Sequence, residues 1–140
     1  MIKTQICEFI ETFKKEMIYI RETVFCDEQG FSRDIELDGL DDDCVHVLAK
    51  FNGHFIGTGR MQKDGHIGRI AVLKDYRGQK IGTQIIKTLI NHAKESGLNR
   101  VFLGSQIQAI SFYESLEFVQ YGEVFLEEGV EHIYMELISN

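Results

Sequence analysis

The stretch from Ile67 to Thr83, IGRIAVLKDYRGQKIGT, constrains the fold most, because it reads as an apolar strand, a basic turn and the start of a helix. The first turn of a helix leaves backbone N–H groups without intrahelical partners at the positive end of the helix dipole, so it binds phosphate well. Five basic residues and one acid lie between Arg69 and Lys87, although the formal net charge of the chain is -7. The segment therefore predicts an anion site, with a pyrophosphate as the ligand.

Two other interpretations of this segment bear on the prediction. An ordinary strand-to-helix turn with solvated cations explains the segment, taken alone, equally well. A P-loop does not fit, because Gly78 and Gly82 enclose three residues where that motif needs four, and Thr83 follows Gly82 directly.

The length and composition of the chain limit the classes of protein to which it can belong. Its 140 residues suit one domain, 1–140, that buries roughly two thirds of its unfolded surface. We expect a cytoplasmic protein without a membrane span or signal peptide, because no long apolar stretch is present. The excess of acidic over basic residues disfavours nucleic-acid binding. Cys7, Cys26 and Cys44 form no CxxC pair, which argues against disulfides and a metal site.

Hydrophobic periodicity and turn residues predict a mixed α/β fold. The expected elements are a strand at 2–9, a helix at 10–24, an acidic surface loop with a short helix at 27–43, strands at 45–51, 54–62 and 66–73, a helix at 80–96, a strand at 101–104, a helix at 109–116, and strands at 118–121 and 131–138. Asn52-Gly53 is a strong signal for a type I′ hairpin between two of these strands.

The anion-binding turn resembles the acetyl-CoA diphosphate signature of the GNAT N-acetyltransferases, [QR]-x-x-G-x-[GA]. Arg77 and Gly82 fit this signature, whereas Lys80 stands at its first glycine. Further on, SQIQAISFYESLEF resembles the family segment N/Q-x-x-A-x-x-F-Y-x-x-x-G-F, with Glu117 in place of the glycine. The segment IRETVFCDEQGF resembles the ElaA-like branch. The resemblance implies a GNAT-type fold: a central, mostly antiparallel, splayed sheet flanked by helices.

The same resemblance implies an acetyl-CoA-dependent N-acetyltransferase that needs no metal. It would transfer the acetyl group directly to a primary amine of a small molecule, such as an amino acid or polyamine, or of a peptide. Two alternatives remain open at this point: a noncatalytic acetyl-CoA sensor with the same fold, and a domain that binds some other phosphorylated ligand.

Site residues follow from the resemblance by position. The residues that would bind the cofactor are Ile70, Ala71, Val72, Arg77, Gly78, Gln79, Lys80, Ile81, Gly82, Thr83, Gln106 and Tyr113. Tyr113 would also be the general acid for the departing thiolate. Glu28 or His132 is the candidate general base, with Glu36, Asp38 and Glu131 as further possibilities. The acceptor site would include Phe25, Glu28, Gln29 and His132.

Two acidic segments bear on the acceptor. Residues 27–43 hold eight acids and one arginine, and residues 114–136 hold seven acids without a lysine or arginine. If both line the acceptor mouth, their field favours a cationic amine; a solvated acidic surface is the alternative. The apolar C-terminal strands also suggest a homodimer, so the expected partners are the amine and a second copy, with no nucleic acid and no membrane.

Overall fold

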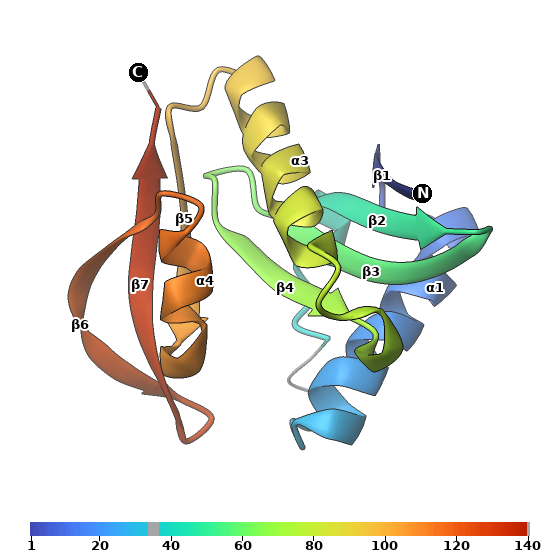
Figure 1. Ribbon diagram of the computed structural model, residues 1–140, viewed down its shortest axis with the longest axis horizontal. Coiled ribbons are helices and arrows are strands. Elements are labelled where there is room, and N and C mark those ends of the chain that lie inside the picture. Colours follow the sequence, from blue (N-terminus) through green and yellow to red (C-terminus); the bar gives the residue numbers. More distant parts are fainter. Residues whose placement is uncertain (34–36, 140) are drawn as a thin grey trace.

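The computed structural model describes residues 1–33 and 37–139, and it contains two antiparallel sheets that lie side by side (Figure 1). The first sheet has the order β1 (Ile2–Cys7), β2 (Val45–Phe51), β3 (His54–Met61), β4 (Ile67–Val72). The second has the order β5 (Arg100–Gln106), β7 (Val130–Ile138), β6 (Val119–Glu127). The predicted mixed α/β class with mostly antiparallel strands is therefore confirmed.

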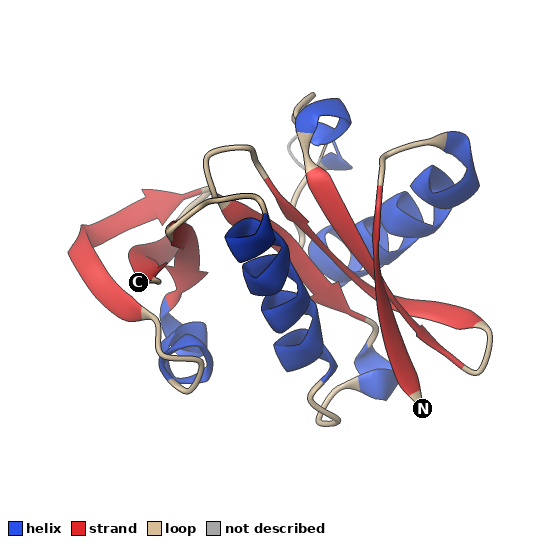
Figure 2. Ribbon diagram, turned by 90° about the horizontal axis from the view of Figure 1, so that it is seen from above, coloured by secondary structure: helices blue, strands red, loops and turns tan. Residues whose placement is uncertain are grey.

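Two helices cover opposite faces of the first sheet (Figure 2). Alternate residues of β2 explain the two cores, because successive strand side chains point to opposite faces. Val47 and Ala49 belong to the core under α3 (Ile81–Glu95), whereas Leu48 belongs to the core under α1 (Glu11–Arg21). The short helix α4 (Ile110–Glu114) flanks the second sheet.

Helix α3 packs closely on the first sheet because glycines stand beneath it. A Cβ atom on Gly59 would lie only 2.6 Å from Ile70 Cδ1 and 2.7 Å from Ile85 Cγ2. The isoleucine and leucine side chains predicted to form the apolar face of this helix, including Ile85 and Leu89, are fully buried. This close packing fixes where the N-terminus of α3 lies relative to β4.

A backbone bridge joins the two sheets, and beyond it they separate. His66 and Phe102 form one isolated parallel bridge, and the Phe102 N–H donates to the Gly65 carbonyl at 3.0 Å. Within the described ranges, no other ladder joins β4 to β5. A Cβ on Gly65 would lie 2.5 Å from the Arg100 carbonyl oxygen, and φ here is +96°, so this junction requires glycine. The splayed sheet implied by the resemblance is thus present.

Strand β4 carries a bulge at the mouth of the gap. Thr58 pairs with Ala71 and Arg60 with Gly68, so Arg69 and Ile70 together oppose the single residue Gly59. Arg69 has φ +51°, in the left-handed region that a bulged residue often adopts. Bulges redirect backbone groups and are common beside active sites.

The structure corrects three local expectations. The helix predicted at 10–24 ends at Arg21 and continues as a π-helical segment, η1 (Glu22–Glu28). The strand predicted at 118–121 is too short, because β6 continues to Glu127 and turns into β7 at Glu128-Gly129, both at positive φ. The acidic loop contains the predicted short helix, η2 (Asp41–Asp43), but Asp41 is buried and not solvated. Glu36, a candidate base, lies outside the described residues.

The described part of the chain contains no helix that is both long and apolar enough to span a membrane.

Candidate active site

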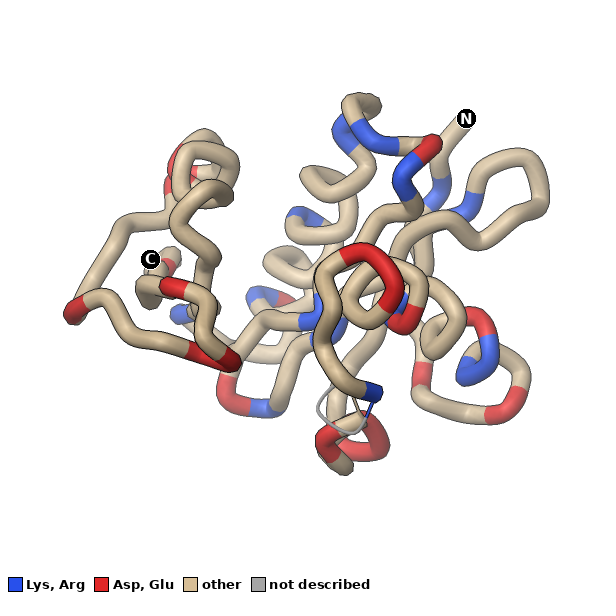
Figure 3. The backbone as a smooth tube through the Cα atoms, turned by 90° about the horizontal axis from the view of Figure 1, so that it is seen from below, with Lys and Arg blue, Asp and Glu red and all other residues tan. Residues whose placement is uncertain are grey.

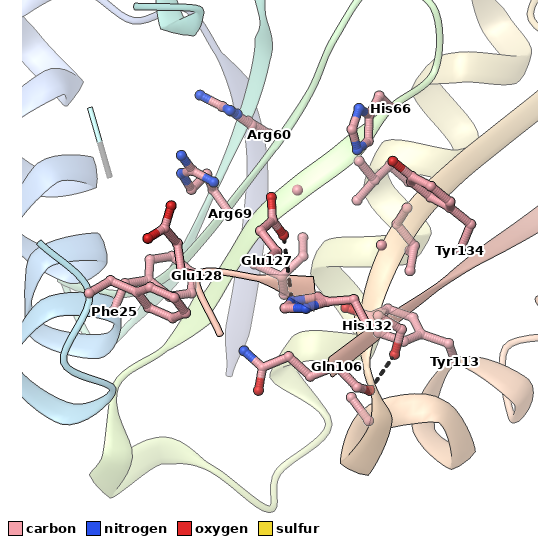
Figure 4. Close-up of a pocket in the computed structure, with 18 of the residues that line it drawn as sticks. Phe25, Arg60, His66, Arg69, Gln106, Tyr113, Glu127, Glu128, His132 and Tyr134 are labelled. Carbon is pink, nitrogen blue, oxygen red and sulfur yellow. Dashed lines mark hydrogen bonds and ion pairs between the residues drawn. The ribbon is translucent and has the colours of Figure 1, made fainter. Parts of the chain in front are cut away.

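A cavity of about 660 Å³ opens where β4 and β5 separate (Figure 4). Its lining includes the β4 bulge, the end of β5 at Gln106, the phenol of Tyr113, and the face of the second sheet that carries His132 and Tyr134. A volume of this size suits a small organic ligand or the reactive end of a larger one. Because β4 is the last strand of its sheet, its outer edge faces this gap and can pair with an extended ligand.

The predicted phosphate turn leads from β4 to the N-terminus of α3. Gly78, Gln79 and Lys80 are exposed on this turn, and Ile81, Gly82 and Thr83 form the first helical turn. Their backbone N–H groups point out of the helix N-terminus, as an anion site needs. The predicted residues of this segment are therefore together at one place.

The side chain of Arg77 is exposed but is held beside the turn by hydrogen bonds. Its Nε–H donates to the Val72 carbonyl at 2.9 Å. Its guanidinium binds both carboxylate oxygens of Glu28, at 2.9 and 3.0 Å. Glu28 lies at the end of η1, and it is not among the residues that line the cavity.

The residue after Glu28 contacts the opposite side of the gap. Gln29 accepts a hydrogen bond from Gln106 Nε2 at 3.3 Å, and Gln106 Oε1 also accepts one from Gln108. The end of η1 therefore touches the β4 side through Glu28 and the β5 side through Gln29. Phe25, Gln29 and His132 of the predicted acceptor residues line the cavity.

Tyr113 presents its phenol to the cavity from α4. Burial raises the pKa of Tyr113 to about 12, so the hydroxyl keeps its proton at neutral pH. The ring is held by edge contacts with Phe112 and Phe118, at centroid distances of 5.0 and 5.8 Å. Among the residues described, no partner accepts the hydroxyl proton, which leaves it available to a ligand atom.

His132 lies on β7, 5% exposed, with its ring stacked on Phe125 at 5.7 Å. Its Nδ1 is 2.8 Å from the Val130 carbonyl oxygen, and because a carbonyl can only accept, Nδ1 carries the proton. In the neutral ring Nε2 is then the unprotonated nitrogen, and it lies 3.5 Å from Glu127 Oε2. His132 can therefore accept a proton beside a carboxylate within the cavity.

The opposite wall contains a network of ion pairs around the buried side chains of Arg21, Arg60 and Asp41. Arg60 is 4% exposed and donates to Asp38 and Asp41, while Arg21 binds Asp41 at 2.7 Å. Burial alone would raise the pKa of Asp38, but hydrogen bonds and charge from Arg60, with help from Arg69, hold it well below its usual range. Asp38 is consequently a poor general base, and the network acts as a rigid wall.

The sequence matches the family model described as "Acetyltransferase (GNAT) domain" over residues 9–139. The chain belongs to the GNAT acetyltransferase family. It is 33% identical over 127 residues to the protein ElaA of Escherichia coli, with 85% of this chain and 83% of that protein covered. It is 34% identical over 125 residues to the uncharacterized N-acetyltransferase YjcF of Bacillus subtilis, with 86% and 89% covered.

Solved structures of the GNAT family agree with this assignment. The crystal structure of Escherichia coli ElaA matches with a TM-score of 0.85 at 30% identity, covering 97% of this chain and 99% of that one. An acyl-CoA N-acyltransferase from Pseudomonas aeruginosa matches with a TM-score of 0.86 at 25% identity, with the same coverage. The chain is thus an acetyltransferase of the ElaA-like type, an enzyme with the GNAT fold.

Both departures from the GNAT pattern stand at backbone positions that favour glycine. Lys80 caps the N-terminus of α3 with φ +62°, and Glu117 follows α4 with φ +73°. L-residues adopt this left-handed conformation at a cost of roughly 1–2 kcal/mol. The family glycines at these places are therefore explained by backbone geometry, and this chain keeps the geometry without the glycine.

Sequence reasoning missed Glu127, Glu128 and Arg60. The two glutamates lie beyond the predicted end of the strand at 118–121. The pair Glu128-Gly129, between two segments of alternating apolar and polar residues, is the sequence signal for the turn that places them. Glu131, considered as a base, is exposed next to His132 on β7 and does not line the cavity. Among the described residues, no group of three or more His, Cys, Asp or Glu could hold a metal ion.

Proposed function

We propose that this GNAT enzyme uses acetyl-CoA to acetylate a primary amine directly, without a covalent acyl-enzyme. The observation that carries the proposal is that one cavity joins the free edge of β4, a protonated phenol at Tyr113 and the imidazole of His132, whose Nδ1 bonds the Val130 carbonyl and whose Nε2 faces Glu127. These three features match the three needs of the reaction: a polarised thioester, a donor for the leaving sulfur and an acceptor for the amine proton.

The residues around the gap fit coenzyme A. Acetyl-CoA supplies the acetyl group as an activated thioester. The outer edge of β4 at Ile70, Ala71 and Val72 would pair with its extended pantetheine arm, and the first turn of α3 would hold the diphosphate with its N–H groups. A fold neighbour that supports this reading is an aminoglycoside 6'-N-acetyltransferase solved with coenzyme A, at a TM-score of 0.76 and 14% identity.

We assign the proton acceptor to His132 rather than Glu28. Nε2 of His132 lies within the cavity, whereas the Glu28 carboxylate is occupied by a two-point ion pair with Arg77. The ammonium first gives one proton to Nε2, which frees the lone pair of the nitrogen. The nitrogen then attacks the thioester carbon, the carbon–sulfur bond breaks, and the second nitrogen proton passes to the departing sulfur or to water. A backbone N–H of the β4 bulge would bind the carbonyl oxygen as its charge grows.

Tyr113 would act on the departing sulfur. A phenol with a pKa of about 12 does not release its proton readily, so its contribution is a strong hydrogen bond to the developing thiolate. Full proton transfer from the phenol is not needed, because a thiol has a pKa of about 8.5 and its thiolate is therefore a good leaving group that can take its proton from the attacking nitrogen or from water.

Mass spectrometry of acetyl-CoA consumption with pooled amines tests the proposal. The pools are amino acids, polyamines, aminoglycosides and peptide N-termini, beside a control without acceptor. Acetylated product from one pool is expected and names the acceptor class. Tight acetyl-CoA binding with no product from any pool would favour the noncatalytic sensor instead.

A further inference from the structure

One face of the second sheet carries a continuous stack of aromatic rings. Phe125 stacks on His132 at 5.7 Å and on Tyr134 at 4.6 Å, and Tyr134 stacks on Tyr121 at 5.6 Å. The strand period of two puts His132 and Tyr134 on one face of β7, and the register places Phe125 opposite His132. We call these four residues, His132, Phe125, Tyr134 and Tyr121, the aromatic face.

The cavity side of this face is open because β5 contributes a glycine there. Gly104 pairs with Tyr134, and a Cβ on Gly104 would lie 3.4 Å from Phe125 Cζ and 3.9 Å from Tyr134 Cε1. Any larger side chain would extend over the two rings. Phe125 and Tyr134 both line the cavity, and Tyr134 is 37% exposed. A ligand in the cavity can therefore reach the aromatic face at Phe125 and Tyr134.

Two carboxylates lie at the end of the aromatic face. Glu127, the last residue of β6, and Glu128, in the turn to β7, line the cavity, and Glu127 lies beside His132. Figure 3 shows that acidic positions predominate on the second sheet, at the left, and the segment 114–136 contains no lysine or arginine. The cavity arginines, Arg60 and Arg69, lie on the first sheet and both bind Asp38.

We propose that the acceptor is a primary ammonium carried on an aromatic or other flat apolar body, with its charge at Glu127 and its body on Phe125 and Tyr134. The inference rests on the proposed function and names the substrate class of that same site. An ammonium bound to the Glu127 carboxylate lies within reach of His132 Nε2, because those two groups are 3.5 Å apart. The same carboxylates repel an amine that carries a negative charge.

The first experiment measures binding without chemistry. The protein is saturated with coenzyme A, which has no acetyl group to transfer, and three probes are titrated by calorimetry. Tyramine has the ammonium and the ring, ethylamine has only the ammonium, and 3-(4-hydroxyphenyl)propionate has the ring with a negative charge. We expect tyramine to bind at least about tenfold more tightly than either control, the size of a favourable ring or cation–π contact.

The outcomes separate this inference from the proposed function. Equal affinity for tyramine and ethylamine, or for tyramine and the propionate, overturns the acceptor class while leaving acetyl transfer intact. Failure of coenzyme A itself to bind overturns the proposed function and the acceptor class with it.

Three variants then assign the contacts. Glu127→Gln should weaken tyramine and ethylamine alike, by about tenfold, and leave the propionate no weaker. Tyr134→Leu should lower the ratio of tyramine to ethylamine affinity, which a merely structural role would not change. Glu123→Gln, an exposed acid on the same strand outside the cavity, is the matched control. Wild-type coenzyme A affinity in each variant shows that it folds; unchanged tyramine binding in both Glu127→Gln and Tyr134→Leu overturns the assignment.

Discussion

Glu117 adopts a backbone conformation that favours glycine, at a position where the GNAT pattern has glycine. It ends α4 in the left-handed region at φ +73°, and the Phe118 N–H bonds back to the Tyr113 carbonyl at 3.1 Å. Glu117→Gly should raise the free energy of unfolding by about 1 kcal/mol, because glycine adopts this conformation without steric cost. Urea unfolding checks the value. Glu117→Ala is the control; an equal gain from alanine would assign the effect to the carboxylate and not to φ.

A substitution at Tyr113 tests the proposed chemistry. Tyr113→Phe should lower kcat by about a hundredfold with little change in the KM for acetyl-CoA, because in the proposed mechanism the hydroxyl serves only the leaving sulfur. Since burial raises the pKa of the phenol to about 12, wild-type activity should show no loss from its deprotonation below about pH 10. Steady-state kinetics by mass detection tests both points, and an unchanged kcat would remove Tyr113 from the mechanism.

At the scale of elements, η1 connects the acceptor side of the cavity to the phosphate turn through Glu28 and Arg77. Glu28→Gln should release Arg77 for the diphosphate, so coenzyme A binds a few times more tightly, while stability falls by less than about 1 kcal/mol for this partly exposed pair. Pantetheine, which lacks the diphosphate, is the matched ligand and should gain nothing. A hundredfold fall in kcat would instead identify Glu28 as the base.

The elements that sequence predicted well are those whose signals are local. The apolar period of α3 and the Asn52-Gly53 hairpin lie within one element or one turn, and both are present. The π-helical η1 was missed, since its composition continues that of α1 and only the backbone bonds distinguish the two. The predicted strand at 118–121 ends too early because Gly122, at φ +73°, interrupts the alternation of apolar and polar residues in β6. The register with β7 shifts at the same place.

The residues of the candidate site likewise fall into those with a local sequence signal and those without one. The proposed phosphate turn is contiguous in the chain, so its residues could be predicted from spacing and resemblance. Glu127 and Arg60 reach the cavity only through strand pairing and packing, and Arg60 lies 22 positions from its partner Asp38. From sequence alone such charges are interpreted as solvated surface groups, whereas the fold buries Arg60 and brings Glu127 beside His132.

At the scale of the whole molecule, buried histidines make stability depend on pH. His46 is 1% exposed, stacks on Phe9 and donates from Nε2 to the Asp41 carbonyl at 2.9 Å. Burial lowers the pKa of His46 below its ordinary value of 6.5, and burial also lowers that of His66 at the junction of the two sheets. A group with a depressed folded-state pKa contributes stability above its unfolded pKa and loses it as pH falls through the folded value.

The free energy of unfolding should therefore be constant between about pH 7 and 8 and fall as the pH drops below about 6.5. A second loss follows below about pH 4, where Asp41, whose pKa is lowered against the effect of burial by Arg21 and Arg60, begins to take up its proton in the unfolded state. Urea unfolding across this range measures both steps. His46→Gln should reduce the first step without abolishing it, because His66 remains, whereas the exposed His54→Gln should leave it unchanged. If His46→Gln retains the full first step, the ionisation of other groups governs it, and the buried imidazole under α1 is not the source of the pH dependence.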